Sequence, residues 1–592
     1  MTVRPLPQMP VRRLRCAIAA VCVSTASLTV LLSTSDDYGM VWDEGHTIRR
    51  EEQLARWFTW LWKPPAGRSR WDAFSQAALA RSWPFSREEP DGHPPFYALL
   101  GLAGWSATHS FLEPLTAYRV GPMMLYAATV GVLFWYLAMR QGWLAAAAGS
   151  GSLVLMPRLF SHAHYAHYDM VVSCLWLLAQ MAFVHSLRSR AGMLTFGLLL
   201  GLAFGTKFTG MLAAAPSLLW LIWQATCSLL FRTAQLAGPP TSVSQDVAVD
   251  APAGTPGRNL CSITGAMSFG AFGRWVMGVA VAVGVLYLMT PPWWFEPMRG
   301  PFRFLESNLS RADTKPIPTW YLANVYPFAL PWHNTLVLTA ATVPMGMLLV
   351  ALVGGASVVA RRRTEPDLML WLLSWSVLMV VRALPVAPGH DGVRQFLPSI
   401  VGLTVLVGLG AAELARRSRT TTRGRWASRL IVAAVLGEGL AGIVRLYPYT
   451  LSYYNAAVGG LAGAERRGFE LTYYWDTMST EFLDWVRERS RRERLELRFP
   501  SNLVNVPFLR RWHELPADVS IVGIENTERP YYVLQRRFGV YYPYDWWLDR
   551  NGRACFSVKR HGVDLLRVYS YEESLKAYQA TRNVPIPPHL RY

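Results

Sequence analysis

The segment that decides the fold is residues 16–46, which read CAIAAVCVSTASLTVLLSTSDDYGMVWDEGH. Its first part, residues 16–35, is apolar and close to the roughly 20 residues that a helix needs to cross a bilayer. Asp43 and Glu44 stand side by side shortly after this run. Carboxylates at the end of a membrane helix are costly to hold near lipid, so they usually mark a functional site. The alternative is a solvated loop in which the two acids cap a helix.

The basic stretch from Arg4 to Arg15 precedes this apolar run, a pattern that is also typical of a cleaved signal peptide. No clear small-x-small cleavage site follows the run, and the acid pair comes directly after it. We therefore expect residues 16–35 to remain as the first membrane helix.

The composition indicates a polytopic membrane protein. The chain has 592 residues, of which 52% are hydrophobic and 16% are charged, whereas soluble domains are about a quarter charged. Its net charge of +19 is explained by arginines in cytoplasmic loops and by phosphate binding, and it does not indicate nucleic acid. The six cysteines are scattered without a CxxC pair, which argues against a disulfide framework and a thiolate metal site.

About eleven apolar runs have the length of membrane spans. They cover residues 16–35, 120–139, 143–159, 169–187, 192–206, 208–231, 271–290, 335–360, 366–386, 395–414 and 429–446. A further short run, 95–110, begins at Pro94-Pro95, and we expect it to lie at the interface or re-enter. If this run did cross, the sidedness of the middle of the chain would be inverted.

The arginine distribution sets the sidedness. Arginines 12, 13 and 15 place the N-terminus in the cytoplasm, and later arginine groups fall on the same side. The expected fold is an α-helical polytopic membrane protein with a small extracytoplasmic α/β domain at its C-terminus. Residues 1–464 form the membrane module and residues 465–592 form the α/β domain. In the module, 36–94 and 291–334 are outer loops, and 233–268 is a flexible cytoplasmic loop.

Strand-prone runs at 519–522, 531–534 and 565–569 support the α/β assignment, and a helix-prone stretch at 480–494 precedes them. The first outer loop is different. It carries amphipathic stretches rich in Trp, Arg and Glu, which are typical of helices that lie on a membrane surface.

Three further groups of side chains are expected at the outer face. Asp169 is an acid at a span boundary, where it would face the acid pair. His93 precedes two prolines that stiffen the first outer loop. Three histidines lie just before Asp169 and leave a divalent metal open as an alternative, although their spacing is not a standard zinc pattern; they are His162, His164 and His167.

Two cations lie at the expected outer ends of spans, although the positive-inside rule favours lysine and arginine on the cytoplasmic side. Lys207 stands alone between two apolar runs, and Arg394 begins another run after Asp391. Such cations are suited to an anionic partner such as phosphate. The alternative is that they extend to the lipid headgroups.

In order along the chain, these motifs resemble the dolichyl-phosphate-mannose protein mannosyltransferase superfamily, glycosyltransferase family 39, which includes bacterial aminoarabinose transferases. The similarity covers roughly residues 10–475. The matching stretches are Trp42-Asp43-Glu44, His93-Pro94-Pro95-Phe96-Tyr97, Asp169, Gly205-Thr206-Lys207-Phe208-Thr209-Gly210, Tyr321 to Pro331-Trp332-His333, Asp391-Gly392-Val393-Arg394, and Pro448 to Asn455 with Gly459-Gly460.

The resemblance implies the GT-C fold in the cytoplasmic (inner) membrane, with the active site facing outside the cytoplasm. It implies transfer of a sugar from a polyprenyl-phosphate donor to an acceptor hydroxyl, with inversion, and with Asp43 as general base. Glu44 and Asp169 are its expected catalytic companions. Lys207, Arg394 and His93 are expected to bind the donor phosphate. Other residues expected to line the site are His46, Trp332, His333 and Asp391.

Two other function classes stay open. One is a transporter or flippase that uses buried charges as a substrate path, but its typical internal repeat is not recognisable here. The other is a non-catalytic membrane scaffold. For the enzyme, the acceptor is left open between protein, lipid, glycan and small molecule.

The predicted sidedness places both Ser69 and Ser501 outside the cytoplasm. Cysteines introduced at these positions, in a background without the native cysteines, should react with a membrane-impermeant thiol reagent in spheroplasts. Protection of both cysteines until the membrane is permeabilised would contradict the topology.

Overall fold

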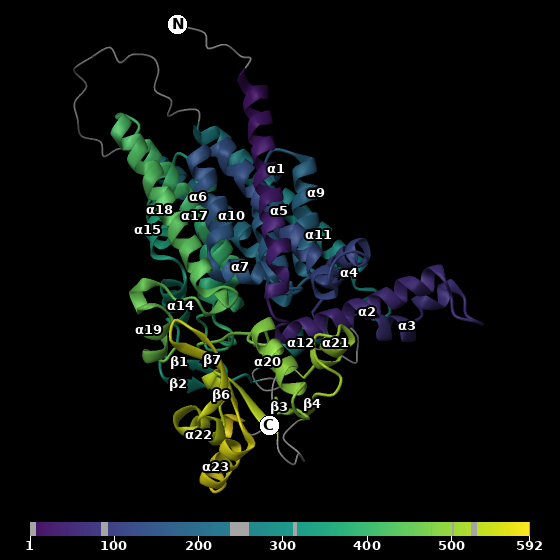
Figure 1. Ribbon diagram of the computed structural model, residues 1–592. Helices are drawn as coiled ribbons and strands as arrows, with labels where there is room; N and C mark the ends of the chain where they lie inside the picture. Colours follow the sequence, from purple (N-terminus) through teal and green to yellow (C-terminus); the bar gives the residue numbers. More distant parts are fainter. Residues whose placement is uncertain are drawn as a thin grey trace, which may run out of the picture.

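Long apolar helices make up most of the computed structural model, which describes residues 8–83, 93–236, 260–311, 316–474, 476–499, 503–522 and 530–590. Within these residues, seven helical segments are long and apolar enough to cross a membrane, and they form the bundle in Figure 1. They include α1 (Gln8–Thr34), α5 (Pro114–Arg140), α8 (Tyr168–Ser186), α10 (Ala215–Leu236), α11 (Leu260–Met289), α17 (Leu397–Arg417) and α18 (Thr422–Leu446). The prediction of a many-helix membrane protein is confirmed.

Proline divides two of the predicted spans. The run 143–159 forms α6 (Trp143–Leu155) and α7 (Pro157–His164), which are bent by 64° relative to each other. The run 335–360 forms α14 (Asn334–Thr342) and α15 (Met345–Arg361), with Pro344 between them. A proline lacks the N–H donor and its ring clashes with the preceding turn, so a helix ends before it. Each of these two predicted runs therefore contains two helices in place of one.

Two shorter apolar helices, α9 (Arg190–Phe204) and α16 (Met369–Val381), occupy further predicted spans. The run 95–110 forms α4 (Phe96–Thr108), which has 13 residues. At 1.5 Å per residue such a helix is about 20 Å long, and whether it crosses the membrane stays a prediction. The total of eleven spans stays a prediction.

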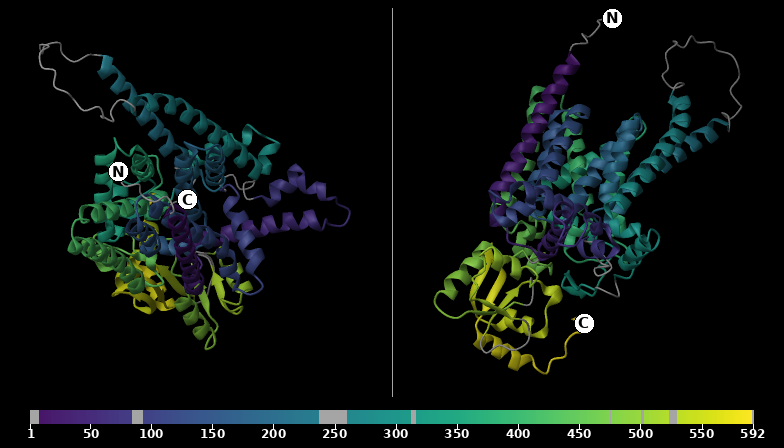
Figure 2. Two further views of the ribbon diagram at one scale, coloured as in Figure 1. Left: turned by 90° about the horizontal axis from the view of Figure 1, so that it is seen from above. Right: turned by 90° about the vertical axis from the view of Figure 1, so that its right-hand side faces the viewer.

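The first predicted outer loop, 36–94, folds mainly as helix. α2 (Trp42–Trp62) runs across one end of the bundle, and η2 (Arg70–Phe74) and α3 (Gln76–Ser82) pack beneath it. Figure 2 shows this arm projecting sideways beyond the bundle. The Trp57 indole stiffens the arm by donating to the Ala73 carbonyl at 2.8 Å.

The other two loops of the membrane module differ from each other. The predicted outer loop 291–334 contains η4 (Pro291–Trp294), α12 (Arg299–Leu309) and an antiparallel pair of strands, β1 (Thr319–Tyr321) and β2 (Asn324–Tyr326). The structure describes only the two ends of the predicted flexible loop 233–268, and both are helical. Helix α10 extends to Leu236 and α11 begins at Leu260, because the flanking residues are apolar; residues 237–259 lie outside the described residues.

The C-terminal region forms the expected small α/β unit at the end of the bundle that also carries α2 (Figure 1). Its five-stranded sheet has the order β4-β3-β5-β7-β6, with β3 parallel to β4 and β5, and β7 antiparallel to β5 and β6. The elements are α20 (Thr480–Ser490), β3 (Glu496–Arg498), α21 (Val506–Arg511), β4 (Ser520–Val522), β5 (Tyr531–Gln535), α22 (Pro543–Asn551), β6 (Ala554–Arg560), β7 (Val563–Tyr569) and α23 (Tyr571–Thr581). All three predicted strand runs are present.

The boundary expected at residue 465 falls inside α19 (Gly460–Arg466). The chain after this helix joins the two parts of the molecule through Glu470, a buried carboxylate. It accepts hydrogen bonds from the backbone N–H groups of Trp320 in β1 at 3.2 Å, and of Phe538 and Gly539 at 2.9 Å. One side chain therefore ties the second outer loop to the α/β domain.

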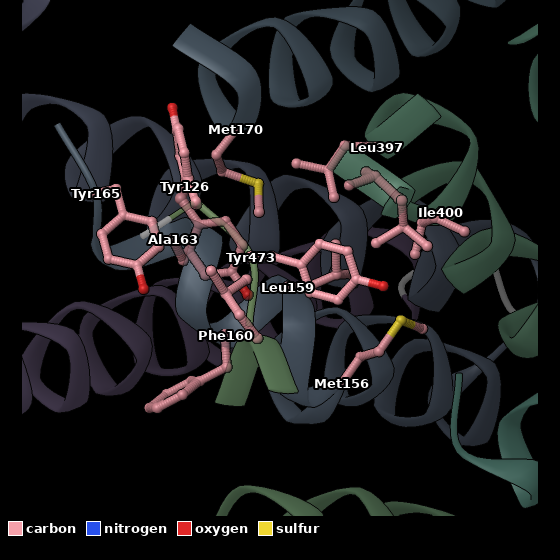
Figure 3. Close-up of a cluster of buried hydrophobic side chains, with 14 of the residues drawn as sticks. Tyr126, Met156, Leu159, Phe160, Ala163, Tyr165, Met170, Leu397, Ile400 and Tyr473 are labelled. Carbon is pink, nitrogen blue, oxygen red and sulfur yellow. The ribbon is translucent and has the colours of Figure 1, made fainter. Parts of the chain in front are cut away.

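Figure 3 shows the apolar packing that supports this junction. Residues from the α7 region, including Leu159 and Phe160, pack with Met170 of α8 and with Leu397 and Ile400 of α17, and all five are buried. The aromatic ring of Tyr473, from the segment after α19, lies in the same cluster. The rigid core thus reaches directly to the segment that precedes the α/β domain.

Close approach of α4 to α5 requires glycine. A Cβ atom added at Gly121 would lie 2.0 Å from the carbonyl oxygen of Leu100, and one added at Gly104 would lie 2.4 Å from the backbone nitrogen of Gly121. Real Cβ atoms do not approach backbone this closely, so either helix would have to move.

We therefore expect Gly121→Ala to lower the melting temperature in detergent by several degrees, although alanine is the better helix former by about 1 kcal/mol. The matched control is Gly437→Ala in α18, where a Cβ would meet nothing within 4 Å. That variant should keep or raise the melting temperature. Equal melting temperatures for the two variants would contradict this packing.

Candidate functional site

Asp43 lies in the first turn of α2, and one of its carboxylate oxygens collects four donors. Oδ2 accepts from the Tyr168 hydroxyl at 2.9 Å and the Tyr474 hydroxyl at 3.0 Å, and lies 3.0 Å from Nε2 of His167. The Arg394 guanidinium also donates to it. Oδ1 takes none of the hydrogen bonds made by the described residues, and the side chain is 18% exposed.

Arg394 connects three carboxylates. Its Nη2 reaches Asp43, its Nε donates to Asp169 Oδ2 at 2.6 Å, and its Nη1 donates to Asp391 Oδ2 at 2.7 Å. The guanidinium carbon also lies 3.9 Å from the ring centroid of Tyr474. A planar fork with several donors suits this arrangement, and a lysine could not reproduce it.

Asp169, predicted as a second catalytic acid, is engaged on both oxygens. Lys207 Nζ lies 2.5 Å from Oδ1, and Oδ2 receives Arg394 and lies 2.9 Å from Nδ1 of His167. The carboxylate is 2% exposed. Its position suits holding these two cations in place rather than taking a proton from a substrate.

Glu44, the neighbour of Asp43, turns into the protein. It forms a two-bond pair with Arg119, with both distances 2.8 Å, and both side chains are fully buried. It also accepts from the backbone N–H of Val41 at 3.0 Å and of Ala166 at 2.8 Å. The geometry therefore gives Glu44 a role in fixing the start of α2, and does not support the predicted role beside the base.

Two cavities meet at this network. The larger has a volume of about 610 Å³ and the smaller about 260 Å³. Both are lined by Tyr168, Arg311, His390 and Arg394. Asp43 lines only the larger cavity and Lys207 only the smaller; the larger also carries Asp391 and Asp545 together with Arg498 and Arg537, so charges of both signs line it.

The smaller cavity carries cations without carboxylate partners among the described residues. Arg382 donates to the carbonyl of Gln395 and the hydroxyl of Thr209, each at 3.0 Å, and both acceptors are neutral. Arg311 makes no hydrogen bond or ion pair with the described part of the chain. Two guanidinium groups in one small cavity favour an anionic ligand.

The rim of this smaller cavity is apolar. Leu309 and Val386 line it and are 71% and 77% exposed. Leu309 belongs to α12, which also exposes Phe302 and Leu305. An exposed apolar helix beside a basic cavity is suited to a ligand with a charged head and a hydrocarbon chain.

The larger cavity is walled by the α/β domain. Residues of β3, β5 and the segment before α22 face Asp43 across it. They are Arg498, Tyr532, Leu534, Gln535, Arg537, Val540, Tyr541, Tyr542 and Asp545. Arg537 also pairs with Asp391 at 3.1 Å, which links this wall to Arg394.

Burial and neighbouring charges shift the pKa values of the buried site residues in opposite directions. Burial would raise the pKa of Asp43, but the Arg394 guanidinium and the bond with His167 lower it well below its usual value. Burial likewise acts to raise the pKa of Asp391, but Arg537 and Arg394 lower it to about 2. Burial lowers the pKa of Lys207 to about 8 despite Asp169. At neutral pH both carboxylates are ionised.

The remaining predicted residues divide into two groups. His93 lines the smaller cavity against the Tyr168 ring, and Asp391 lines the larger. Neither cavity is lined by His46, Trp332 or His333. His46 is exposed on α2, Trp332 is 70% exposed, and His333 hydrogen-bonds the Tyr321 hydroxyl at 2.9 Å.

The three histidines do not converge. His164 pairs with the Thr34 hydroxyl at 2.8 Å and the Phe160 carbonyl at 2.7 Å, whereas His167 lies between the two aspartates. His162 is buried near Tyr474. No group of three His, Cys, Asp or Glu side chains in the described residues is placed to hold a metal ion.

Several site residues were not found from the sequence. Tyr168 and Tyr474 are two of many tyrosines, and Arg311 and Arg382 are two of many arginines in a basic chain. Arg382 did carry one signal, because it stands at the outer end of a predicted span, as Arg394 does.

No profile of a known protein family and no curated protein matches the chain. Among solved structures, it is similar to ArnT from Cupriavidus metallidurans bound to undecaprenyl phosphate, at 14% identity and a TM-score of 0.43, over 93% of this chain and 97% of that one. It is also similar to the oligosaccharyltransferase AglB from Archaeoglobus fulgidus in complex with an inhibitory peptide and a dolichol-phosphate, at 13% identity and a TM-score of 0.43, over 80% of this chain and 58% of that one.

Glu44→Gln should destabilise the protein strongly, because it leaves the fully buried Arg119 without its counter-charge. Breaking a buried pair costs about 3–5 kcal/mol, and a lower melting temperature in detergent would report it. Glu52→Gln on the same helix is the control. The pair of Glu52 with Arg511 lies at the surface, so its loss should change the melting temperature little. Unchanged stability of Glu44→Gln would contradict the structural role.

Proposed function

We propose that this protein is a membrane glycosyltransferase of the GT-C type. It moves a sugar from a polyprenyl-phosphate donor to an acceptor hydroxyl on the extracytoplasmic face of the cytoplasmic membrane. One observation carries the proposal: Arg394 contacts both Asp43, whose Oδ1 takes no hydrogen bond from the described residues, and a second, basic cavity with an apolar rim. The resemblance of the ordered sequence motifs to family 39 supports it.

The smaller cavity suits the donor phosphate. Arg382 and Arg311 offer charge that no described carboxylate neutralises, and Lys207 adds a third cation. The exposed apolar residues of α12 and the rim provide a path for the polyprenyl chain toward the membrane. His93, buried in the same cavity, is placed to contact the phosphate or the sugar.

The larger cavity suits the acceptor. Its volume of about 610 Å³ accommodates a molecule of several sugar or amino-acid units, and its wall is built from the α/β domain. Oδ1 of Asp43 is the free acceptor atom on this side. The sequence of the α/β wall would then determine which acceptor is used.

The proposed reaction joins a donor in the smaller cavity to an acceptor in the larger cavity. The acceptor oxygen attacks the anomeric carbon of the sugar, and a new glycosidic bond forms as the bond to the phosphate oxygen breaks. The acceptor proton passes to Oδ1 of Asp43. The departing phosphate is stabilised by Lys207 and the arginines and needs no protein acid. Attack from the face opposite the phosphate inverts the anomeric configuration.

Asp169, Asp391 and Glu44 act as positioning residues in this scheme. Asp169 and Asp391 fix the Arg394 fork from two sides, and Asp169 also holds Lys207. Glu44 and Arg119 anchor the turn that presents Asp43.

Asp43→Asn should lower sugar transfer by the purified protein by about a hundredfold or more, the usual scale for a general base. Binding of the polyprenyl-phosphate donor should largely survive, because the cations that hold phosphate remain. Transfer is measured with lipid-linked sugars prepared from the native membrane, and binding with labelled polyprenyl phosphate.

Arg382→Gln should give the converse result, a raised KM for the donor with a smaller change in kcat. Asp367→Asn, which alters only a surface pair with Arg140, is the control for both variants. Near-full transfer by Asp43→Asn would exclude it as the base. Absence of any polyprenyl-phosphate binding by the native protein would exclude the proposed function.

A further inference from the structure

Asp43 Oδ2 has more donors than it needs. Four groups converge on this one oxygen: the Arg394 guanidinium, the His167 ring and the hydroxyls of Tyr168 and Tyr474. A carboxylate has about four lone-pair sites over its two oxygens. One donor can therefore leave without stripping Oδ2 of hydrogen bonds.

Arg394 is the donor best placed to leave. Its side chain lines both cavities and carries a full charge, whereas Tyr168, which also lines both, is neutral and Tyr474 lines only the larger. Its Nη2 already has a second acceptor, the Tyr168 hydroxyl at 3.0 Å. Two other atoms of the fork, Nε and Nη1, are held by Asp169 and Asp391. A small rotation about these two anchors would take Nη2 away from Asp43 without releasing the guanidinium.

We propose that the donor phosphate, on binding in the smaller cavity, draws Nη2 of Arg394 away from Asp43 Oδ2 and so makes the base available only in the donor complex. This inference rests on the proposed function and concerns its regulation. In the donor-free protein Asp43 is held as one partner of an ion pair. In the donor complex it keeps the neutral hydroxyls of Tyr168 and Tyr474, which orient it.

The charges around Asp43 favour such an exchange. The groups that face it are Arg394 from η6 (Gly392–Phe396), His167 and Tyr168 from the start of α8, and Tyr474 from the segment after α19. Asp391 and Asp169 lie behind Arg394. A phosphate in the smaller cavity adds negative charge beside the Arg394 guanidinium. Arg382 and Lys207 line the same cavity and attract the phosphate.

Moving the Arg394 guanidinium away from Asp43 changes the basicity of the Asp43 carboxylate. Arg394 is the largest influence that lowers the pKa of Asp43, and burial is the largest that raises it. When Arg394 is shared with phosphate, its lowering effect on the pKa of Asp43 weakens, and the carboxylate becomes a stronger base. The acceptor hydroxyl is then activated only when a sugar donor is in place, and donor binding precedes productive acceptor binding.

The test is to follow the protonation of Asp43 by difference infrared spectroscopy as a function of pH, with and without saturating polyprenyl phosphate that carries no sugar. The Asp43 band is assigned by its loss in Asp43→Asn. We expect polyprenyl phosphate to raise the midpoint of protonation by about one pH unit or more, a tenfold change in proton affinity.

Arg382→Gln is the matched variant. It should need more polyprenyl phosphate to saturate but show the same shift at saturation, because Arg394 is intact. Arg394→Lys, which lacks the fork, should show a smaller shift. An Asp43 midpoint that polyprenyl phosphate leaves unchanged, in protein that binds it and transfers sugar, would overturn the coupling alone. Protein that neither binds polyprenyl phosphate nor transfers sugar would instead overturn the proposed function.

Discussion

The structure depends on one guanidinium that binds three carboxylates from separate segments. Arg394 joins Asp43 at the start of α2, Asp169 at the start of α8 and Asp391 just before its own helical turn. Buried charges are stable only when they are paired and hydrogen-bonded. Each of these segments must therefore take a fixed position relative to the others, and the two cavities form around that point.

Two of the six described residues other than glycine that have a positive φ belong to this network. Asp391 has a φ of 60° and Tyr474 a φ of 64°, both in the left-handed region that residues with a side chain rarely adopt. Both contact Arg394, one by an ion pair and one by its ring. Such conformations cost about 1–3 kcal/mol each and persist where the surrounding structure holds them. The ion-pair network is what holds them here.

The sequence predicted the parts of this arrangement that have a local signature. The length of the apolar runs indicated a helical membrane protein. Asp43, Lys207 and Arg394 were proposed as site residues because charged side chains are unfavourable at the ends of predicted spans, and the structure brings all three into one network. The role of Glu44 was not predictable, because consecutive residues of a helix point about 100° apart and the sequence does not say which faces the cavity. Tyr474 lies 431 residues from Asp43, a contact that only the folded chain creates.

The same reasoning applies to Asp169, which the sequence predicts as a second catalytic acid and for which we propose a positioning role. An acid at a span boundary has the same sequence signature whether it takes a proton or neutralises a cation. Only the distances to Lys207 and Arg394 distinguish the two. Arg311 has no local signature that separates it from the other arginines of a chain with a net charge of +19.

The most direct test of the central claim is an experimental structure of the protein with polyprenyl phosphate bound. The two-cavity arrangement requires the phosphate to lie in the smaller cavity, in contact with Lys207 and Arg382, with the chain leaving past α12. The larger cavity beside Asp43 should remain open for the acceptor. A phosphate bound in the larger cavity, or outside both, would contradict the account.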